Sequence, residues 1–103
     1  MSWSDDLNRA ITADVRGQNE EAESFFEKAV KSVQTDLGPY DLNVARCLMT
    51  YAQFLERKNR LEDARNRYQL ALSIFKMSDD QANRSLCTMA LQRVEFALLK
   101  RNQ

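Results

Sequence analysis

Histidine is absent from the 103 residues, and this absence excludes much enzyme chemistry. Imidazole is the commonest general base at neutral pH and the commonest zinc ligand. The two cysteines, Cys47 and Cys87, lie far apart in sequence, and neither has an imidazole to activate it as a nucleophile. We therefore expect no enzymatic activity, no metal and no cofactor, and we assign both cysteines to contacts between helices.

Glycine and proline are also scarce, with two residues of the first and one of the second. Gly17 and Gly38 cannot build a loop that cradles phosphate. So few turn residues also exclude a sandwich of many short strands. The composition therefore predicts an all-α chain of a few long helices with short connections.

The chain has no net charge, because 15 basic residues balance 15 acidic ones. Nucleic-acid-binding proteins usually carry a strong basic excess, so we expect no nucleic-acid partner. The chain has no apolar run long enough to cross a bilayer and no secretory signal, so we expect no membrane contact and a cytoplasmic location. Residues 1–41 nevertheless carry −5 and residues 42–103 carry +5. This asymmetry indicates either a charge dipole along stacked helices or charges scattered over solvated faces.

Five helices are predicted from the apolar periodicity and the residues between its segments. The expected N-caps are Ser4, Asn19, Asp41 and either Ser78 or Asp79. The expected left-handed helix ends are Gly17, Gly38 (before Pro39) and Asn59. The predicted helices span residues 5–16, 20–35, 42–58, 61–77 and 80–100 of a single domain covering 1–103.

An internal repeat appears when the sequence is shifted by 42 residues, which lays the second helix on the fourth and the third on the fifth. Small and aromatic positions coincide: Ala22 with Ala64, Phe26 with Tyr68, Ala29 with Ala71, Val44 with Leu86, Ala45 with Cys87, Ala52 with Val94 and Phe54 with Phe96. One helix pair cannot bury both of its apolar faces alone. Stacked pairs with a continuous core are therefore predicted.

Residues 48–71 resemble a tetratricopeptide repeat, with a small, small, aromatic, small pattern at Ala52, Ala64, Tyr68 and Ala71. The long period and the Leu37-Gly38-Pro39 linker are similar to the kinesin-light-chain-like variant. The resemblance covers residues 10–100 and implies a right-handed α-α superhelix of about five antiparallel helices, or two and a half repeats.

The first helix departs from this pattern, because Asp6 and Arg9 stand where the third helix has Leu48 and Tyr51. Charged side chains do not enter a dry interface without partners. We therefore expect the first helix to pack in a shifted register, as a terminal cap, and the fifth helix to form the C-terminal cap. The apolar stripe expected for the first helix is Trp3, Leu7, Ala10 and Ile11.

In tetratricopeptide repeat proteins the first helix of each pair lines a concave groove that binds peptides. The resemblance implies groove positions at Arg46, Met49, Thr50, Gln53 and Arg57, then at Thr88, Leu91, Gln92 and Glu95, with Leu7 and Ile11 as counterparts in the first helix. Long polar side chains beside a methionine suit an extended peptide or a partner helix, and a plain solvated face is the alternative. The carboxylate clamp of co-chaperone members is missing, since its positions read Leu7, Ile11, Thr50, Thr88 and Gln92.

The sequence thus predicts a protein–protein interaction module, an adaptor that binds a peptide or partner protein in the groove. The alternative is a structural repeat protein that forms homodimers or head-to-tail assemblies. A basic cluster spans the turn after the third helix: Arg57, Lys58, Arg60, Arg65 and Arg67. It is expected to contact an acidic partner or the acidic N-terminal part of another copy, or else only to solubilise the surface.

Overall fold

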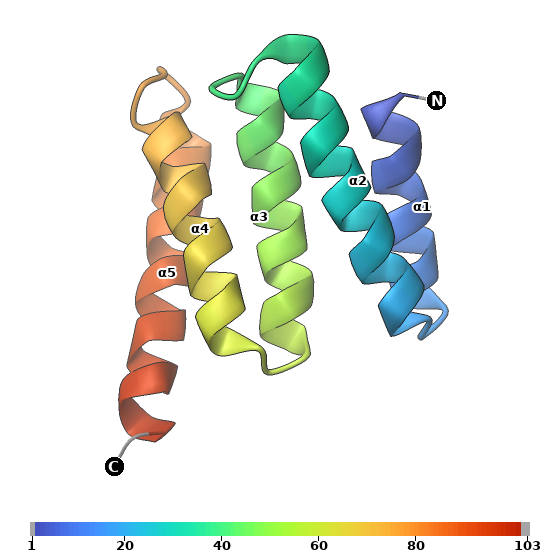
Figure 1. Cartoon of the computed structure of the whole chain (residues 1–103). Helices are drawn as coiled ribbons and strands as arrows, with labels where there is room; N and C mark the ends of the chain where they lie inside the picture. The colour runs from blue at the N-terminus through green and yellow to red at the C-terminus, as the bar shows by residue number, and fades with distance from the viewer. Residues whose placement is uncertain (1, 102–103) are drawn as a thin grey trace.

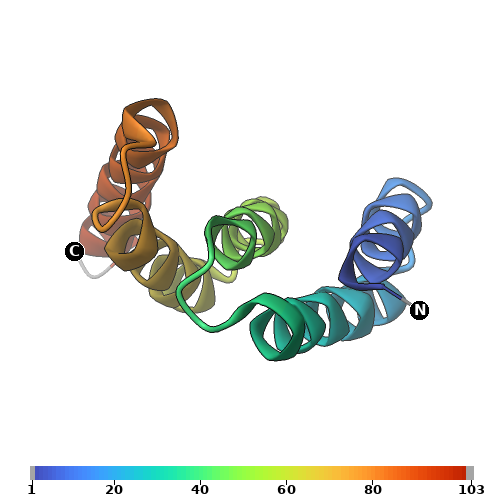
Figure 2. The ribbon, with the colours of Figure 1, turned by 90° about the horizontal axis from the view of Figure 1, so that it is seen from above.

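The computed structural model describes residues 2–101, and five helices account for most of them. The helices are α1 (Trp3–Val15), α2 (Asn19–Leu37), α3 (Leu42–Arg57), α4 (Leu61–Phe75) and α5 (Gln81–Arg101). Consecutive helices run antiparallel (Figure 1), and seen from above α1, α3 and α5 form one layer while α2 and α4 form the other (Figure 2). No strand occurs in the described range, so the all-α prediction is confirmed.

The start of α1 corrects the predicted N-cap. Ser2, not Ser4, caps the helix: its Oγ accepts the Asp5 N–H at 3.3 Å, and Asp5 accepts the Ser2 N–H at 3.4 Å. This reciprocal pair needs an acid three residues after the cap, and Asp5 supplies it only for Ser2. Ser4 therefore lies inside the helix.

Two further helix starts differ from the prediction and one agrees with it. Asn19 is the first residue of α2 and Gln18 precedes it without a side-chain cap. Asp41 does cap α3, by accepting the Asn43 N–H at 2.8 Å. Before α5, Asp80 accepts the Asn83 N–H at 3.2 Å, so Asp80 takes the capping role predicted for Ser78 or Asp79.

The ends of α1 and α3 repeat the same hydrogen-bond pattern 42 residues apart. Gly17 and Asn59 have φ angles of 76° and 61°, in the left-handed region. The next N–H in each case reaches back to a helix carbonyl, Gln18 to Ala13 at 2.8 Å and Arg60 to Leu55 at 2.9 Å. This is the Schellman arrangement, and it confirms the left-handed ends predicted at Gly17 and Asn59. Gly38, the third predicted end, has a positive φ of 95° but an extended ψ of 154°.

An aromatic cluster at the centre of the molecule joins the two hairpins. Phe26 of α2 stacks on Tyr51 of α3 with ring centroids 5.3 Å apart, and lies 5.3 Å from the Phe54 ring. All three rings are buried, and the core continues without a break from Ala10 in α1 to Leu98 in α5. The repeat therefore produces the continuous core that it predicts.

Helix α1 packs in the same register as α3, so the predicted shift is wrong. Its buried residues are Asp6, Ala10 and Ala13, which stand 42 residues before Leu48, Ala52 and Leu55, all buried in α3. Ile11 of the predicted apolar stripe is 40% exposed. Asp6 is 6% exposed, and no fully buried side-chain nitrogen or oxygen in residues 2–101 lacks a hydrogen-bond partner.

The side of α5 that packs on α4 does not correspond to the side of α3 that packs on α2. Its buried residues are Cys87, Ala90, Val94 and Leu98. Ala90 and Val94 lie two periods after Asp6 and Ala10, so α5 uses the side that α1 uses. The counterparts of the α3 residues packed on α2 are consequently exposed, including Phe96. A C-terminal cap has a polar outer face, and α5 does not.

No helix within residues 2–101 combines the length and apolarity needed to cross a membrane.

Candidate protein-binding surface

The predicted groove residues of α3 share one face of that helix. Arg46, Gln53 and Arg57 are exposed, whereas Met49 and Thr50 are half-buried. Their spacing of three and four residues places them together and away from the buried side of α3. The structure thus places all five in the layer that also holds α1 and α5 (Figure 2).

The α5 set follows the same arrangement. Gln92 and Glu95 are exposed, and Thr88 and Leu91 are half-buried. Met49 and Leu91 also pack against the core, so the two sets combine an apolar base with polar edges. On α1, Leu7 is half-buried and packs on the core, while Ile11 is exposed.

Two threonines of this surface have their hydroxyl protons engaged. Thr50 Oγ1 donates to the Arg46 carbonyl and Thr88 Oγ1 donates to the Arg84 carbonyl, each at 2.9 Å. Each hydroxyl therefore has only its oxygen lone pairs left for a ligand. The surface can accept hydrogen bonds at these two points.

The two arginines of the α3 set differ in their surroundings. Arg57 is paired with Asp14 of α1. Arg46 Nη2 lies 3.8 Å from Asp80 Oδ2, a long contact on a side chain that is more than half exposed. Hydrogen bonds from Asn83, together with the charge of Arg46, hold the pKa of Asp80 below its usual value. Arg46 is therefore the better placed of the two to meet an external carboxylate or carbonyl.

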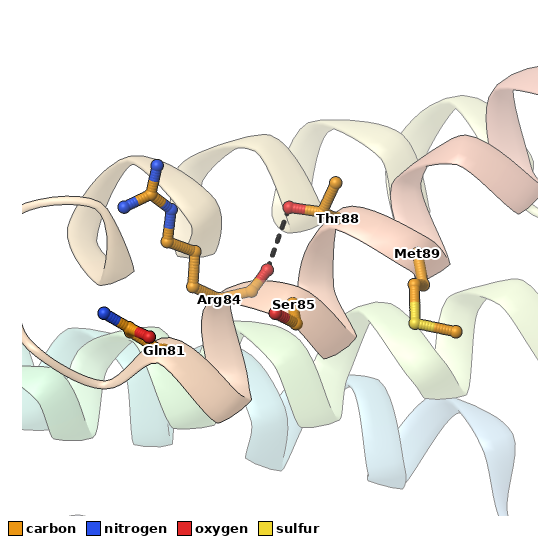
Figure 3. Close-up of a pocket in the computed structure, with 5 residues that line it drawn as sticks. All are labelled: Gln81, Arg84, Ser85, Thr88 and Met89. Carbon is orange, nitrogen blue, oxygen red and sulfur yellow. Dashed lines mark hydrogen bonds between the residues drawn. The ribbon is translucent and has the colours of Figure 1, made fainter.

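A shallow hollow of about 460 Å³ lies at the start of α5, outside the predicted α3 set. Its lining residues are Gln81, Arg84, Ser85, Thr88 and Met89. Figure 3 shows Arg84 and Met89 at opposite ends of it, with the Thr88 hydroxyl bonded to the Arg84 carbonyl. Thr88 alone belongs to the predicted groove.

The basic cluster after α3 finds acidic partners within the same chain. Arg57 and Lys58 both approach Asp14, the latter at 3.8 Å. Arg60 contacts Glu23 at 2.5 Å and Asp63 at 2.9 Å. The hydrogen bond from Arg60 lowers the pKa of Glu23. Three cations of the cluster thus bind the acidic α1–α2 hairpin of their own molecule.

Two tyrosines at the helix junctions bind glutamates, and these contacts are not predicted from the sequence. Tyr51 Oη donates to Glu23 and Glu27 at 3.2 and 3.3 Å. Tyr68 Oη donates to Glu56 at 2.9 Å. Both tyrosines are buried, and this burial raises the pKa of each phenol well above its usual value. The repeat gave no signal for these contacts, because Glu23 and Glu27 fall on Arg65 and Gln69 at the 42-residue shift.

Glu56 also binds α5. Arg93 reaches it through Nε at 2.6 Å and Nη2 at 2.8 Å, a two-point contact. The Arg93 hydrogen bond is the main reason that the pKa of Glu56 is lowered. One carboxylate therefore joins α3, α4 and α5 through Tyr68 and Arg93.

The cysteines occupy the contacts between helices that the sequence predicted. Both are buried, and burial raises the pKa of each thiol to about 11. The Cys87 thiol donates to the Tyr68 carbonyl at 3.2 Å. Among residues 2–101, no three histidine, cysteine or acidic residues are grouped to hold a metal ion.

Comparison with known proteins adds the family. A family model described as tetratricopeptide repeat matches residues 6–77, the segment that contains the α1–α2 and α3–α4 hairpins. No curated protein matches the chain. The match covers well over half of the sequence and agrees with the helix order and the repeated helix ends. The chain belongs to the tetratricopeptide repeat family.

Proposed function

We propose that this chain is an adaptor that binds an extended peptide or a partner helix on the surface formed by α1, α3 and α5. The observation that supports it best is the composition of that surface. Half-buried Met49 and Leu91 lie beside exposed Arg46, Gln53 and Gln92. A surface of this kind offers apolar contact and directional hydrogen bonds at once. Tetratricopeptide repeats generally mediate protein–protein interaction, which agrees with the proposal.

The partner is a protein rather than a nucleic acid or a membrane in this proposal. The balanced total charge and the internal pairing of the basic cluster support it. The 42-residue period and the Leu37-Gly38-Pro39 linker support assignment to the kinesin-light-chain-like variant. A cytoplasmic location fits the two unpaired thiols. No catalytic step or cofactor forms part of the proposal.

The test compares charge reversal on the two layers of the molecule. Arg46→Glu reverses a charge on the proposed surface. Lys31→Glu makes the same charge reversal at an exposed position of α2, in the other layer. Affinity capture with mass spectrometry is run on the wild type and both variants. We expect to identify proteins that the wild type and the Lys31→Glu variant capture and that the Arg46→Glu variant does not. A groove of this size predicts micromolar affinity, about −5 to −8 kcal/mol, and at least a tenfold loss for Arg46→Glu. Partners indifferent to both substitutions would refute the proposed surface.

Self-assembly is the second candidate function, and the exposed apolar side of α5 is the observation that favours it. Its head-to-tail version has lost support, because Asp14 and Glu23 of the same molecule already neutralise part of the basic cluster. Sedimentation velocity over a range of protein and salt concentrations decides between the two. A chain that stays monomeric at every protein and salt concentration supports the adaptor function. A salt-sensitive oligomer supports self-assembly.

A further inference from the structure

An apolar stripe runs along the side of α5 that faces away from α4. Leu86, Met89 and Phe96 are 53%, 62% and 61% exposed. Their spacing of three and seven residues puts them on one face. Met89 and Phe96 lie opposite the buried Cys87 and Val94, and Leu86 lies at the edge of the stripe. A contiguous exposed apolar face on a helix marks an interaction site.

The internal repeat shows what covers this face elsewhere in the molecule. The counterparts of the stripe in α3 are Val44, Cys47 and Phe54, which are 0%, 0% and 1% exposed. Phe54 packs on the ring of Phe26, which α2 contributes. Helix α2 therefore covers the side of α3 that corresponds to the open side of α5. A helix placed like α2 is the natural occupant of that open side.

The local geometry repeats as well. Lys58 lies 5.6 Å above the Phe54 ring, and Lys100 lies 5.2 Å above the Phe96 ring. The α5 stripe thus repeats the lysine–phenylalanine contact of its covered counterpart. In α3 the phenylalanine of that contact also packs on Phe26, which α2 supplies.

Charge specifies the occupant further. In the covered interface, Glu23 and Glu27 of α2 accept the Tyr51 hydroxyl. The position equivalent to Tyr51 in α5 is Arg93, which is more than half exposed although it binds Glu56. A helix placed like α2 would bring its acids toward this cation.

We propose that the Leu86–Met89–Phe96 stripe of α5 binds an acidic amphipathic helix of another protein, with an aromatic residue on its apolar face. The aromatic ring packs on Phe96 as Phe26 packs on Phe54, and the acids meet Arg93. A second copy of α5 is a poor occupant, because its stripe presents the same two cations, Arg93 and Lys100, and no acidic residue. The surface is separate from the α3 groove.

The probe for this proposal is a fluorescein-labelled peptide with the sequence of residues 18–38, which carries the aromatic residue and the glutamates of α2. Its binding to the whole chain is followed by fluorescence anisotropy. We expect saturable micromolar binding, weakened at least tenfold by the double substitution Met89→Ser and Phe96→Ser. A peptide with Glu23→Lys and Glu27→Lys should bind at least tenfold more weakly to the unmodified chain.

Matched controls keep the result interpretable. Tyr40→Ser removes an exposed aromatic residue elsewhere, and Arg46→Glu alters the proposed groove; both should leave peptide affinity unchanged. The Met89→Ser, Phe96→Ser chain should keep the wild-type urea midpoint, since the stripe is exposed. A large fall in that midpoint would show that the stripe is buried within the chain and would overturn the proposal.

Three other outcomes also overturn it. Peptide binding that survives the double substitution would place the peptide elsewhere on the chain. Self-association of the wild type that the double substitution abolishes would make a second copy the occupant. Binding to phosphatidylserine vesicles that depends on Met89 and Phe96 would make a membrane surface the occupant.

Discussion

Single side chains at the helix junctions carry much of the specificity of this fold. Glu56 is the clearest example, because its carboxylate accepts hydrogen bonds from Tyr68 and from Arg93. Tyr68 is fully buried, so its hydroxyl depends on that acceptor. We expect Glu56→Ala to lower the free energy of unfolding by about 1–3 kcal/mol, because a buried donor is left without a partner. Urea denaturation followed by circular dichroism measures it.

The control for this substitution is Glu95→Ala, which removes an exposed glutamate from α5. It should change the free energy of unfolding by less than about 0.5 kcal/mol. Equal effects of the two substitutions would contradict the role given to Glu56.

The same contacts determine how the stability of the fold changes at acidic pH. The pKa values of Glu23 and Glu56 are both lowered from 4.5, chiefly by hydrogen bonds from Arg60 and Arg93. A lowered pKa in the folded state contributes stability above the unfolded pKa, and that contribution is lost as pH falls through the folded pKa. We expect the urea midpoint to fall as the pH is lowered from about 5 toward 3. The Glu23→Gln, Glu56→Gln double variant should show a smaller fall, and an identical pH dependence would refute this explanation.

At the scale of the secondary-structure element, the helix ends are the repeated feature. Gly17 has φ 76°, and nothing lies within 4 Å of a Cβ added there. A side chain at this position would therefore cause backbone strain but no steric clash. We expect Gly17→Ala to lower the free energy of unfolding by about 1–2 kcal/mol. Gly17→Asn should cost less, since asparagine already occupies the equivalent position, Asn59, at φ 61°. Thermal denaturation of the two variants compares them, and a larger loss for asparagine would be the contrary result.

At the scale of the whole molecule, the α1–α2 hairpin is held to the remaining helices by the aromatic cluster and by ion pairs at one end. Asp14 contributes the pairs to Arg57 and Lys58. We expect Asp14→Asn to accelerate hydrogen exchange in α1 and α2 up to about fivefold, as befits ion pairs worth up to 1 kcal/mol, and to leave α4 and α5 unchanged. Hydrogen exchange with mass spectrometry resolves the helices. Asp36→Asn, on the exposed end of α2, is the control, and uniform acceleration over all helices would argue against a separate hairpin.

The candidate surface was predictable only in part. The helical spacing of Arg46, Gln53 and Arg57 identifies a shared face, because that spacing is a local property of the chain. It does not show that Arg57 is engaged by Asp14, since the two lie 43 residues apart and meet only when the hairpins pack. It also does not show the hollow at the start of α5. The binding role of these residues stays a prediction.

The sequence by itself determined the number of helices, their connections and the left-handed ends at Gly17 and Asn59, because periodicity and capping act over a few residues. It also determined the small and aromatic core positions of α2, α3 and α4. Only the tertiary structure decided which side of α5 meets α4, where Asp6 lies, and which acids bind the basic cluster. Those outcomes depend on how segments distant in sequence approach one another. A helix with apolar residues on two sides can bury either, and in α5 the small residues around Ala90 and Val94 pack on α4 while Phe96 stays exposed.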